Sequence, residues 1–359
     1  MKTLLYPRPA DISAALARPS AGNADIDVSV REVLARVRAE GDVALREFSQ
    51  KFDGYAPESF KVDENTLNEA EKSVPMELRE AMREALANIT AFHSAQLRST
   101  EPVITADGVK CWSADVAIEK VGLYIPGGTA PLFSTVLMLA IPARLAGCRD
   151  IIMCTPPGKD GRVNPLILYA ATLSGVTDIY TSGGAQAIAA MAYGTESIPS
   201  VYKIFGPGNR YVTRAKELVQ LEGTAIDMPA GPSEVLVIAD ETANPVFVAA
   251  DLLSQAEHGA DSQVIMLTDS RIMIEQVKTE IEKQSALLER NSLAVQSLEN
   301  SSLILLDTID ECLKVSNRYA PEHLILATSD PYLHAAAVVN AGSVFLGNYS
   351  SESTGDYTT

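Results

Sequence analysis

The chain has 359 residues, 47% of them hydrophobic and 21% charged, which is typical of a folded globular protein of two or three domains and excludes a disordered chain. Its 46 acidic and 29 basic residues give a formal net charge of −17, which argues against a nucleic-acid-binding surface, because phosphate contacts need clustered Lys and Arg. With no apolar stretch suited to a signal peptide or a membrane span, and four cysteines without disulfide or C-x-x-C spacing, the sequence predicts a cytoplasmic protein without membrane contact.

Residues 1 to about 100 are predicted to be helical. Apolar residues recur at helical spacing from residue 30 to about residue 52 and again from 64 to 97, with many Glu, Arg and Lys between them. This pattern is typical of helices that wrap around a core. No chemistry is assigned to this region, and His93 is interpreted as a surface or packing residue.

From residue 121 short apolar runs that end in Gly or Pro alternate with stretches of helical length. Such alternation predicts parallel βαβ units with right-handed crossovers. The predicted strands are residues 121–125, 150–154, 178–180 and 202–205, and the predicted helices are residues 134–146, 164–174, 185–193 and 209–221.

A second alternating series follows a Gly- and Pro-rich joint at residues 228–233. Its predicted strands are residues 234–239, 263–267, 302–306, 324–326 and 343–346, and its predicted helices are residues 245–258, 271–288, 309–319 and 331–341. We therefore predict an α/β fold of two Rossmann-like parallel-sheet domains with N-terminal wrapping helices. Residues 1–118 and 231–359 are expected to form one discontinuous domain, and residues 119–230 an inserted one.

Four strand-end loops are rich in glycine, at residues 125–129, 181–186, 205–209 and 229–233. Ligands of open parallel sheets bind at strand ends. None of the loops has the G-x-G-x-x-G pattern, since Tyr211 stands where a third glycine would follow Gly206 and Gly208. Each loop alone is more often a tight turn, but four at one end of a sheet favour a nucleotide or another polar ligand.

Two of the four histidines lie beside other groups that can bind metal or move protons. Gln255 and His258 are three residues apart near a helix end, so their side chains can lie on one face and bind one cation. Asp356 adds a possible third oxygen ligand. The alternative, that His258 caps the helix before Gly259, is equally compatible with the sequence.

Glu322 and His323 form the second cluster, between Pro321 and a predicted strand. A Glu beside a His offers two acid–base groups for two proton transfers, provided that both face one cavity. A solvated polar loop is the equal alternative. His334, inside a predicted helix, is interpreted as a surface residue.

In combination these segments resemble the histidinol dehydrogenase family. The resemblance spans nearly the whole chain and is densest from residue 121 to residue 356. The stretches that carry it are GLYIPGG (residues 122–128), TSGGAQAIAA (181–190), FGPGN (205–209), DMPAGPSEV (227–235), DLLSQAEHG (251–259), NRYAPEHL (317–324) and STGDY (353–357).

The resemblance implies an NAD-dependent, four-electron dehydrogenase that oxidises L-histidinol through L-histidinal to L-histidine, the last steps of histidine biosynthesis. It implies one zinc ion per subunit and NAD as cofactors. By match to the family's motifs, the zinc ligands are Gln255, His258 and Asp356, the acid–base pair is Glu322 and His323, the NAD contacts are Tyr124, Gln186 and Asn209, and Ser233 contacts the substrate together with Gln255, His258, His323 and Asp356. The alternatives are a related amino-alcohol or polyol dehydrogenase and a catalytically silent paralogue.

The resemblance further implies an intertwined homodimer in which a C-terminal tail of the partner completes the site with a fourth zinc ligand and a substrate-binding Glu. This sequence ends at Thr359, within the motif that contains Asp356. The family's small C-terminal dimerisation domains are therefore expected to be absent. A chain of this length is expected to bind zinc weakly and to turn over poorly.

Overall fold

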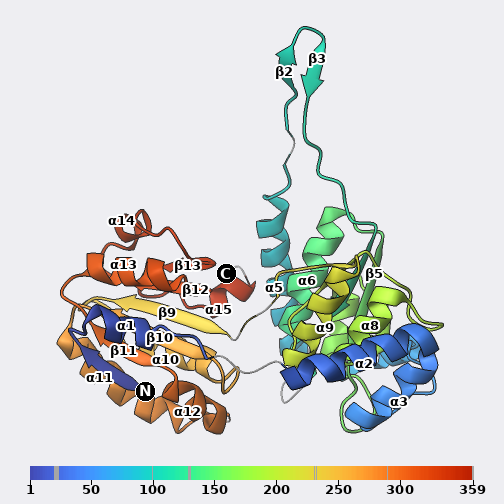
Figure 1. Ribbon diagram of the computed structural model, residues 1–359, viewed down its shortest axis with the longest axis horizontal. Helices are drawn as coiled ribbons and strands as arrows, with labels where there is room; N and C mark the ends of the chain where they lie inside the picture. The colour runs from blue at the N-terminus through green and yellow to red at the C-terminus, as the bar shows by residue number, and fades with distance from the viewer. Residues whose placement is uncertain are drawn as a thin grey trace. The chain divides into compact units, whose positions relative to one another are not determined.

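The computed structural model describes residues 1–19, 24–98, 100–127, 131–229, 231, 233–288 and 290–357, with the backbone alone for residues 24 and 25. The chain divides into two compact units (Figure 1). The first comprises residues 1–21 and 231–356, and the second comprises residues 22–230 and 357–359. Each unit has its own parallel sheet, which confirms the predicted α/β class.

The first unit is built on a parallel sheet with the strand order β1-β11-β10-β9-β12-β13. The central strands are buried along their whole length, as expected for apolar runs covered on both faces. The strands are β1 (Lys2–Leu5), β9 (Glu234–Ala239), β10 (Gln263–Thr268), β11 (Ser302–Leu305), β12 (His323–Ala327) and β13 (Ser343–Leu346).

Helices cover both faces of this sheet (Figure 1). Alternate residues of β9 belong to different cores: Val235 and Val237 pack with one set of helices and Leu236 with the other. The first face is covered by α10 (Pro245–Ala256), α11 (Arg271–Ser285) and α12 (Asn291–Glu299). The second is covered by α1 (Pro9–Ala15) and α13 (Ile309–Tyr319). The short helices α14 (Pro331–Ala335) and α15 (Ser353–Tyr357) follow β12 and β13.

Strand β1 lies in the N-terminal region that was predicted to be helical. Helix α12 lies between the predicted helix at residues 271–288 and the predicted strand at residues 302–306, where no element was predicted. β1 is a four-residue edge strand whose side chains are largely exposed, so it lacks the alternation that marks a half-buried strand. Its pairing with β11, about 300 residues away in the sequence, decides its conformation.

The second unit contains a parallel sheet with the order β6-β5-β4-β7-β8. The chain runs from β4 outward through β5 to β6, returns to β7 on the other side of β4, and continues outward to β8. The connections that follow β4 and β7 therefore leave in opposite directions. Such a switch point is where ligands bind in doubly wound sheets. The strands are β4 (Lys120–Tyr124), β5 (Asp150–Thr155), β6 (Asp178–Thr181), β7 (Lys203–Phe205) and β8 (Ala225–Ile226).

Helices from both the N-terminal region and the βαβ units cover this second sheet. Val37 of α2 and Phe48 of α3 share a core with Ala187 of α8, and Met82 of α5 shares another with Leu137 of α6. The helices are α2 (Ala24–Glu40), α3 (Asp42–Phe52), α4 (Glu64–Ser73), α5 (Met76–Ser94), α6 (Phe133–Ala146), α7 (Pro165–Leu173), α8 (Gly184–Tyr193) and α9 (Arg210–Leu221).

The structure thus places α2–α5 with the second sheet, whereas the sequence analysis assigned residues 1–118 to the first. The physical reason is that helical periodicity shows which face of a helix is apolar but not which sheet that face covers.

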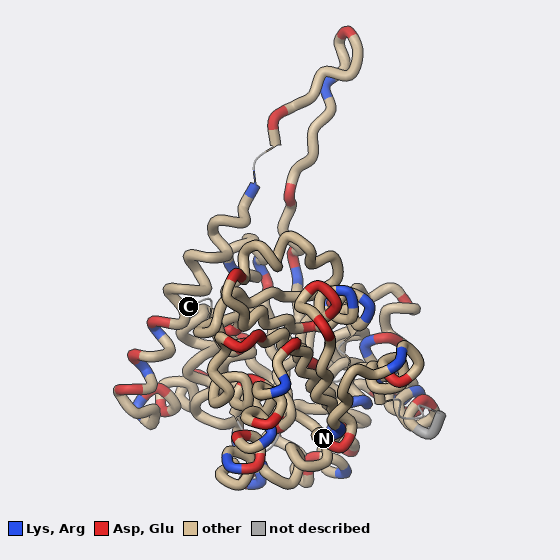
Figure 2. Tube along the Cα trace, turned by 90° about the vertical axis from the view of Figure 1, so that its left-hand side faces the viewer, with Lys and Arg blue, Asp and Glu red and all other residues tan. Residues whose placement is uncertain are grey.

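An antiparallel hairpin of β2 (Val103–Ala106) and β3 (Val109–Cys111) extends from the body of the second unit (Figures 1 and 2). Its residues are exposed on both strands, and charged residues are sparse along it in Figure 2. The sequence analysis did not predict this hairpin. Among the helices of the described residues, none has the length and apolar character needed to cross a membrane.

Candidate functional site

The predicted metal ligands and acid–base pair lie in the first unit, and most of them surround the amino ends of its strands. Glu322 precedes β12 and His323 begins it, while Ser233 immediately precedes β9. Gln255 and His258 lie at the end of α10, just before β10. Ligands of open parallel sheets usually bind at the carboxyl ends, so this site uses the opposite edge.

The ring of His323 is held in one orientation by the backbone of β9. Its Nδ1 lies 3.2 Å from the carbonyl oxygen of Glu234. Because a carbonyl can only accept a hydrogen bond, this contact requires the proton on Nδ1, and the neutral ring therefore carries its basic lone pair on Nε2. Nε2 lies 3.8 Å from Oε1 of Glu352, whose side chain is 10% exposed. The geometry provides a base with a carboxylate that can stabilise its protonated form.

Glu322 is exposed and lies against the same residue of β9. Its Oε2 accepts a long hydrogen bond of 3.4 Å from the backbone N–H of Glu234. The turn that carries Glu322 is held from β13, where the N–H of Ser343 donates to the Glu322 carbonyl at 2.8 Å. A Cβ atom at Gly342 would lie 2.6 Å from that carbonyl, so only glycine permits this close approach. Glu234 therefore contacts both predicted acid–base groups.

The side chain of Gln255 is buried without a hydrogen-bond partner. It is 1% exposed, and neither its amide nitrogen nor its amide oxygen has a partner among the described residues. Burial of an unsatisfied polar group costs about 1–3 kcal/mol, so such an amide is expected to have a ligand in the working protein.

His258 lies beyond the end of α10, where Glu257 is the C-cap residue. Its Nδ1 is 3.3 Å from the hydroxyl oxygen of Ser233. The ring is thus directed to the start of β9, where the predicted substrate contact Ser233 lies. The helix end is closed by the backbone of His258 and not by its ring, because the His258 N–H donates to the Gln255 carbonyl.

Asp356 lies within electrostatic reach of both site histidines. Burial raises the pKa of its carboxyl, repulsion by Glu352 raises it further, and His323 and His258 lower it. No group of three or more His, Cys, Asp or Glu side chains able to hold a metal occurs among the described residues. The predicted ligand set also includes the amide of Gln255, which lies outside these residue types, and together with His258 and Asp356 it would offer one nitrogen and two oxygen donors.

Two acidic residues that the sequence analysis did not select lie beside this group. Burial, with repulsion by Glu352, raises the pKa of Asp251 to about 7. Asp251 is one helical turn before Gln255 on α10. Asp251 begins the stretch DLLSQAEHG but was given no role there. It lies four residues before Gln255, as Glu352 lies four residues before Asp356, and these spacings are the signals that the sequence offers.

The predicted NAD contacts lie in the second unit, around its topological switch point. Tyr124 ends β4, and its buried hydroxyl accepts a hydrogen bond of 3.0 Å from the N–H of Gly184. Burial raises the pKa of this phenol well above its usual range. Asn209 follows β7 and caps α9, where its Oδ1 accepts from two backbone N–H groups at 3.0 and 3.1 Å. Gln186, on α8, is 1% exposed.

The loop after β7 is held against the end of β4 by a buried ion pair. The Nζ of Lys216 donates to the Gly206 carbonyl at 2.7 Å and pairs with Asp227, which accepts from the Gly206 N–H at 2.7 Å. Gly206 has φ +124°, and a Cβ atom there would lie 2.1 Å from the Tyr124 carbonyl oxygen. Lys216 was not among the predicted site residues, although a Lys on the apolar face of a helix is a signal in itself.

Of the glycine-rich loops, those at residues 181–186 and 205–209 are described in full and lie at strand ends of the second unit. The loops at residues 125–129 and 229–233 lie partly outside the described residues. The structure brings Tyr124 and Gln186 together around Asp53, to which the Gln186 amide donates at 3.2 Å.

Asp53 provides a test of this arrangement. Burial raises its pKa to about 6, against about 4 in an unfolded chain. The folded protein therefore binds this proton more tightly, and the free energy of unfolding falls as the pH rises from about 4 through about 6. The Oδ1 of Asn in the Asp53→Asn variant can still accept the hydrogen bond from Gln186. We expect the free energy of unfolding of this variant to fall by about 1–2 kcal/mol less than that of the wild type over this pH range.

The measurement is urea unfolding of both proteins at about pH 4.5 and about pH 8. Asp107→Asn, in the exposed turn of the hairpin, is the control and is expected to follow the wild-type pH dependence. Equal pH dependence of Asp53→Asn and the wild type would contradict the raised pKa.

The chain is similar in sequence and in structure to known proteins of one family. A model of the histidinol dehydrogenase family matches residues 16–359. The histidinol dehydrogenase of Bacteroides fragilis is 57% identical over 357 residues, covering 99% of this chain and 83% of that protein. That of Xanthomonas euvesicatoria is 57% identical over 330 residues, covering 92% and 77%. The crystal structure of histidinol dehydrogenase from Elizabethkingia anophelis matches with a TM-score of 0.97 and 50% identity, covering 99% of this chain and 82% of that one. The chain therefore belongs to the histidinol dehydrogenase family.

Proposed function

We propose that this protein is a zinc-dependent, NAD-linked dehydrogenase that oxidises L-histidinol through L-histidinal to L-histidine. The observation that carries the proposal is the oriented ring of His323, whose basic Nε2 lies beside Glu352, together with the exposed carboxylate of Glu322, which is bound to the same residue of β9 as His323. An oxidation of an alcohol and then of an aldehyde needs a base in both steps and an activated water in the second.

Gln255, His258 and Asp356 would hold the zinc ion, because they combine an imidazole, a carboxylate and a buried amide that has no partner among the described residues. A bound zinc ion would supply a Lewis acid that orients the substrate for the reaction. Tyr124, Gln186 and Asn209 would contact NAD at the switch point of the second sheet, and NAD supplies the hydride acceptor.

In the first step His323 takes the hydroxyl proton on Nε2 as hydride leaves the carbinol carbon, and Glu352 stabilises the imidazolium. In the second step Glu322 removes a proton from the water that adds to the aldehyde. His323, after giving its first proton to the former carbonyl oxygen, takes a hydroxyl proton of the resulting hydrate as the second hydride leaves. The balance is one histidinol, one water and two NAD+ consumed, with one histidine and two NADH formed and protons released to solvent.

We also propose that the protein is a cytoplasmic homodimer. A two-stranded hairpin alone is marginally stable in water, yet β2 exposes Val103 and Ile104 at 62% and 69%, and Trp112, which directly follows β3, is 66% exposed. Such an apolar ribbon favours a protein partner, and a second copy of the chain is the partner we propose. The four cysteines are free in the described structure, which fits a reducing compartment.

The test is NADH formation with L-histidinol in the presence of zinc. We expect two NADH per histidinol consumed. For amino alcohols without an imidazole and for polyols we expect rates at least about 100-fold lower than with histidinol. One NADH per histidinol, or equal rates with a polyol, would instead support a related amino-alcohol or polyol dehydrogenase. No NADH with any of these substrates, from protein that contains zinc, would support a catalytically silent paralogue.

A further inference from the structure

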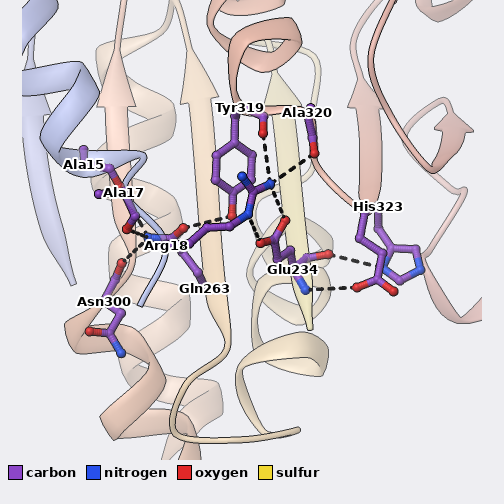
Figure 3. A network of polar contacts seen from close by, with 10 residues as sticks. Ala15, Ala17, Arg18, Glu234, Gln263, Asn300, Tyr319, Ala320 and His323 are labelled. Carbon is purple, nitrogen blue, oxygen red and sulfur yellow. Dashed lines mark hydrogen bonds and ion pairs between the residues drawn. The ribbon is translucent and has the colours of Figure 1, made fainter. Parts of the chain in front are cut away.

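We propose that Arg18 is a positioning residue for the acid–base pair. It joins the start of β9 to the turn that precedes β12, and thereby fixes the orientation of Glu322 and His323 (Figure 3). The inference rests on the proposed function, because it assigns Arg18 a role relative to the two groups proposed there to transfer protons.

The first contact of Arg18 is a two-pronged ion pair. Its guanidinium Nε and Nη2 bind the two carboxylate oxygens of Glu234, with 2.9 Å between Nη2 and Oε2. The Glu234 side chain is only 9% exposed, whereas that of Arg18 is 46% exposed. A buried carboxylate is costly without a partner, and the planar fork of Arg matches it in a way that a Lys ammonium does not. Figure 3 shows the guanidinium lying between Glu234 and Tyr319.

The same guanidinium holds the turn before β12. Nη2 donates to the carbonyl oxygens of Tyr319 at 3.0 Å and of Ala320 at 3.2 Å, and the guanidinium carbon lies 4.5 Å from the centre of the Tyr319 ring. Ala320 has φ +56°, a left-handed conformation that costs a non-glycine residue about 1–2 kcal/mol. Surrounding contacts must therefore maintain this turn, and Glu322 follows it by two residues.

The residue that Arg18 binds is also the residue that holds the acid–base pair. The Glu234 backbone N–H contacts the Glu322 carboxylate at 3.4 Å, and the Glu234 carbonyl accepts from Nδ1 of His323 at 3.2 Å. Arg18 thus reaches the pair along two routes, through Glu234 on β9 and through Ala320 in the turn. A shift of either segment would change the distance between the base and the proton that it removes.

Further hydrogen bonds keep the segment that carries Arg18 in place. The hydroxyl of Tyr319 donates to Oε1 of Gln263 at 2.9 Å, and Nε2 of Gln263 donates to the carbonyls of Ala17 at 3.2 Å and Asn300 at 3.0 Å (Figure 3). These bonds belong to the amino ends of the strands, so the network is continuous with the site. Spacing in the sequence does not reveal it, because Arg18 and Glu234 are 216 residues apart.

The competing explanation is that Arg18 only anchors the N-terminal segment to α13. Arg318 offers a matched control for that role, because its Nη2 donates to the hydroxyl of Ser13 at 2.6 Å and so joins α13 to α1. The contact that Arg318 makes is on the helices, away from the carboxylate of Glu234. An anchoring role predicts similar effects for the two substitutions, and a positioning role predicts an effect for Arg18 alone.

The experiment compares Arg18→Ala, Arg18→Lys and Arg318→Ala with the wild type, using L-histidinol, NAD and zinc. For Arg18→Ala we expect kcat to fall about 10- to 100-fold while KM for histidinol changes less than about threefold, since misplacement of a catalytic group by about 1 Å costs on this order. Arg18→Lys, which keeps the charge and is the variant more certain to fold, is expected to fall between Arg18→Ala and the wild type. Arg318→Ala is expected to stay within about twofold of the wild type.

A second readout does not depend on activity. The chain has four histidines, so NMR spectra of ring-labelled histidine can be assigned by single substitutions. In the wild type and Arg318→Ala we expect His323 as the tautomer with its proton on Nδ1, and in both Arg18 variants a mixture of tautomers. Retained kcat in Arg18→Ala, an equal loss in Arg318→Ala, or an unchanged His323 tautomer in Arg18→Ala and Arg18→Lys would overturn the proposal. A wild type that does not oxidise histidinol would refute the proposed function instead, while the tautomer comparison would still decide the role of Arg18.

Discussion

Replacing His323 by Asn is expected to lower kcat for L-histidinol by about 10²- to 10⁴-fold, the usual contribution of a general base. The amide of Asn can still donate to the Glu234 carbonyl, as Nδ1 of His323 does at 3.2 Å, so the start of β12 is expected to keep its conformation. The variant lacks the basic Nε2 that faces Glu352. Because the same atom is proposed to act in both oxidations, the loss should be seen with L-histidinal as well as with L-histidinol.

Steady-state kinetics with each substrate, together with zinc content, measures this expectation. Zinc content should be unchanged, because His323 is not among the proposed ligands. The matched control is His334→Asn, which replaces a histidine of α14 whose Nδ1 lies 2.8 Å from the Thr328 hydroxyl, and it should leave kcat unchanged. Near-normal turnover of the His323 variant with either substrate would refute its assignment as the base of that step.

Replacing His258 by Ala is expected to weaken zinc binding by more than about 100-fold, because loss of even an outer-shell partner of a ligand costs about 10- to 100-fold. Gln255 supplies a buried amide and Asp356 a carboxylate, and these two groups alone leave the ion without a nitrogen donor of imidazole type. Activity should fall in parallel at low zinc. The increase in melting temperature that saturating zinc produces in the wild type should be reduced accordingly.

Zinc retained after dialysis against a competing chelator, and thermal unfolding with and without zinc, measure this effect. His93→Ala is the control: His93 is on α5 in the second unit, and its Nδ1 contacts only the amide oxygen of Gln96, at 2.9 Å, among the polar contacts given by the described residues. The control should bind zinc as the wild type does. Equal zinc affinity of the two variants would exclude His258 as a ligand.

Much of the fold could be predicted because the strands of both sheets are continuous apolar runs. β9 and β13 begin and end at the predicted residues, and the other predicted strands agree to within one or two residues. Helix α14 is shorter than predicted, since the apolar pattern of residues 331–341 continues past Ala335 where the helix ends. Strands β1 and β8 and the β2–β3 hairpin were missed, because short and largely exposed strands carry no burial pattern.

The site could be predicted in part. The spacing of Gln255 from His258 and the neighbouring Glu322 and His323 marked two candidate clusters, and the resemblance to the family named their roles. Their proximity could not be deduced from spacing. Ser233 and His258 meet at 3.3 Å, and His258 and His323 both act on the pKa of Asp356, because the starts of β9, β10 and β12 lie at one edge of the sheet.

The sequence by itself determined most strands of the two parallel sheets, the family and the identity of the candidate ligands and bases, since these depend on residue types and local order. Only the tertiary structure decided which sheet the N-terminal helices cover, which nitrogen of His323 is basic and which residues orient it. No pattern in the sequence links Arg18 to Glu234 or Glu352 to His323. Their roles arise from hydrogen bonds and ion pairs between segments far apart in the chain, and such contacts are determined by how the strands pair and the helices pack.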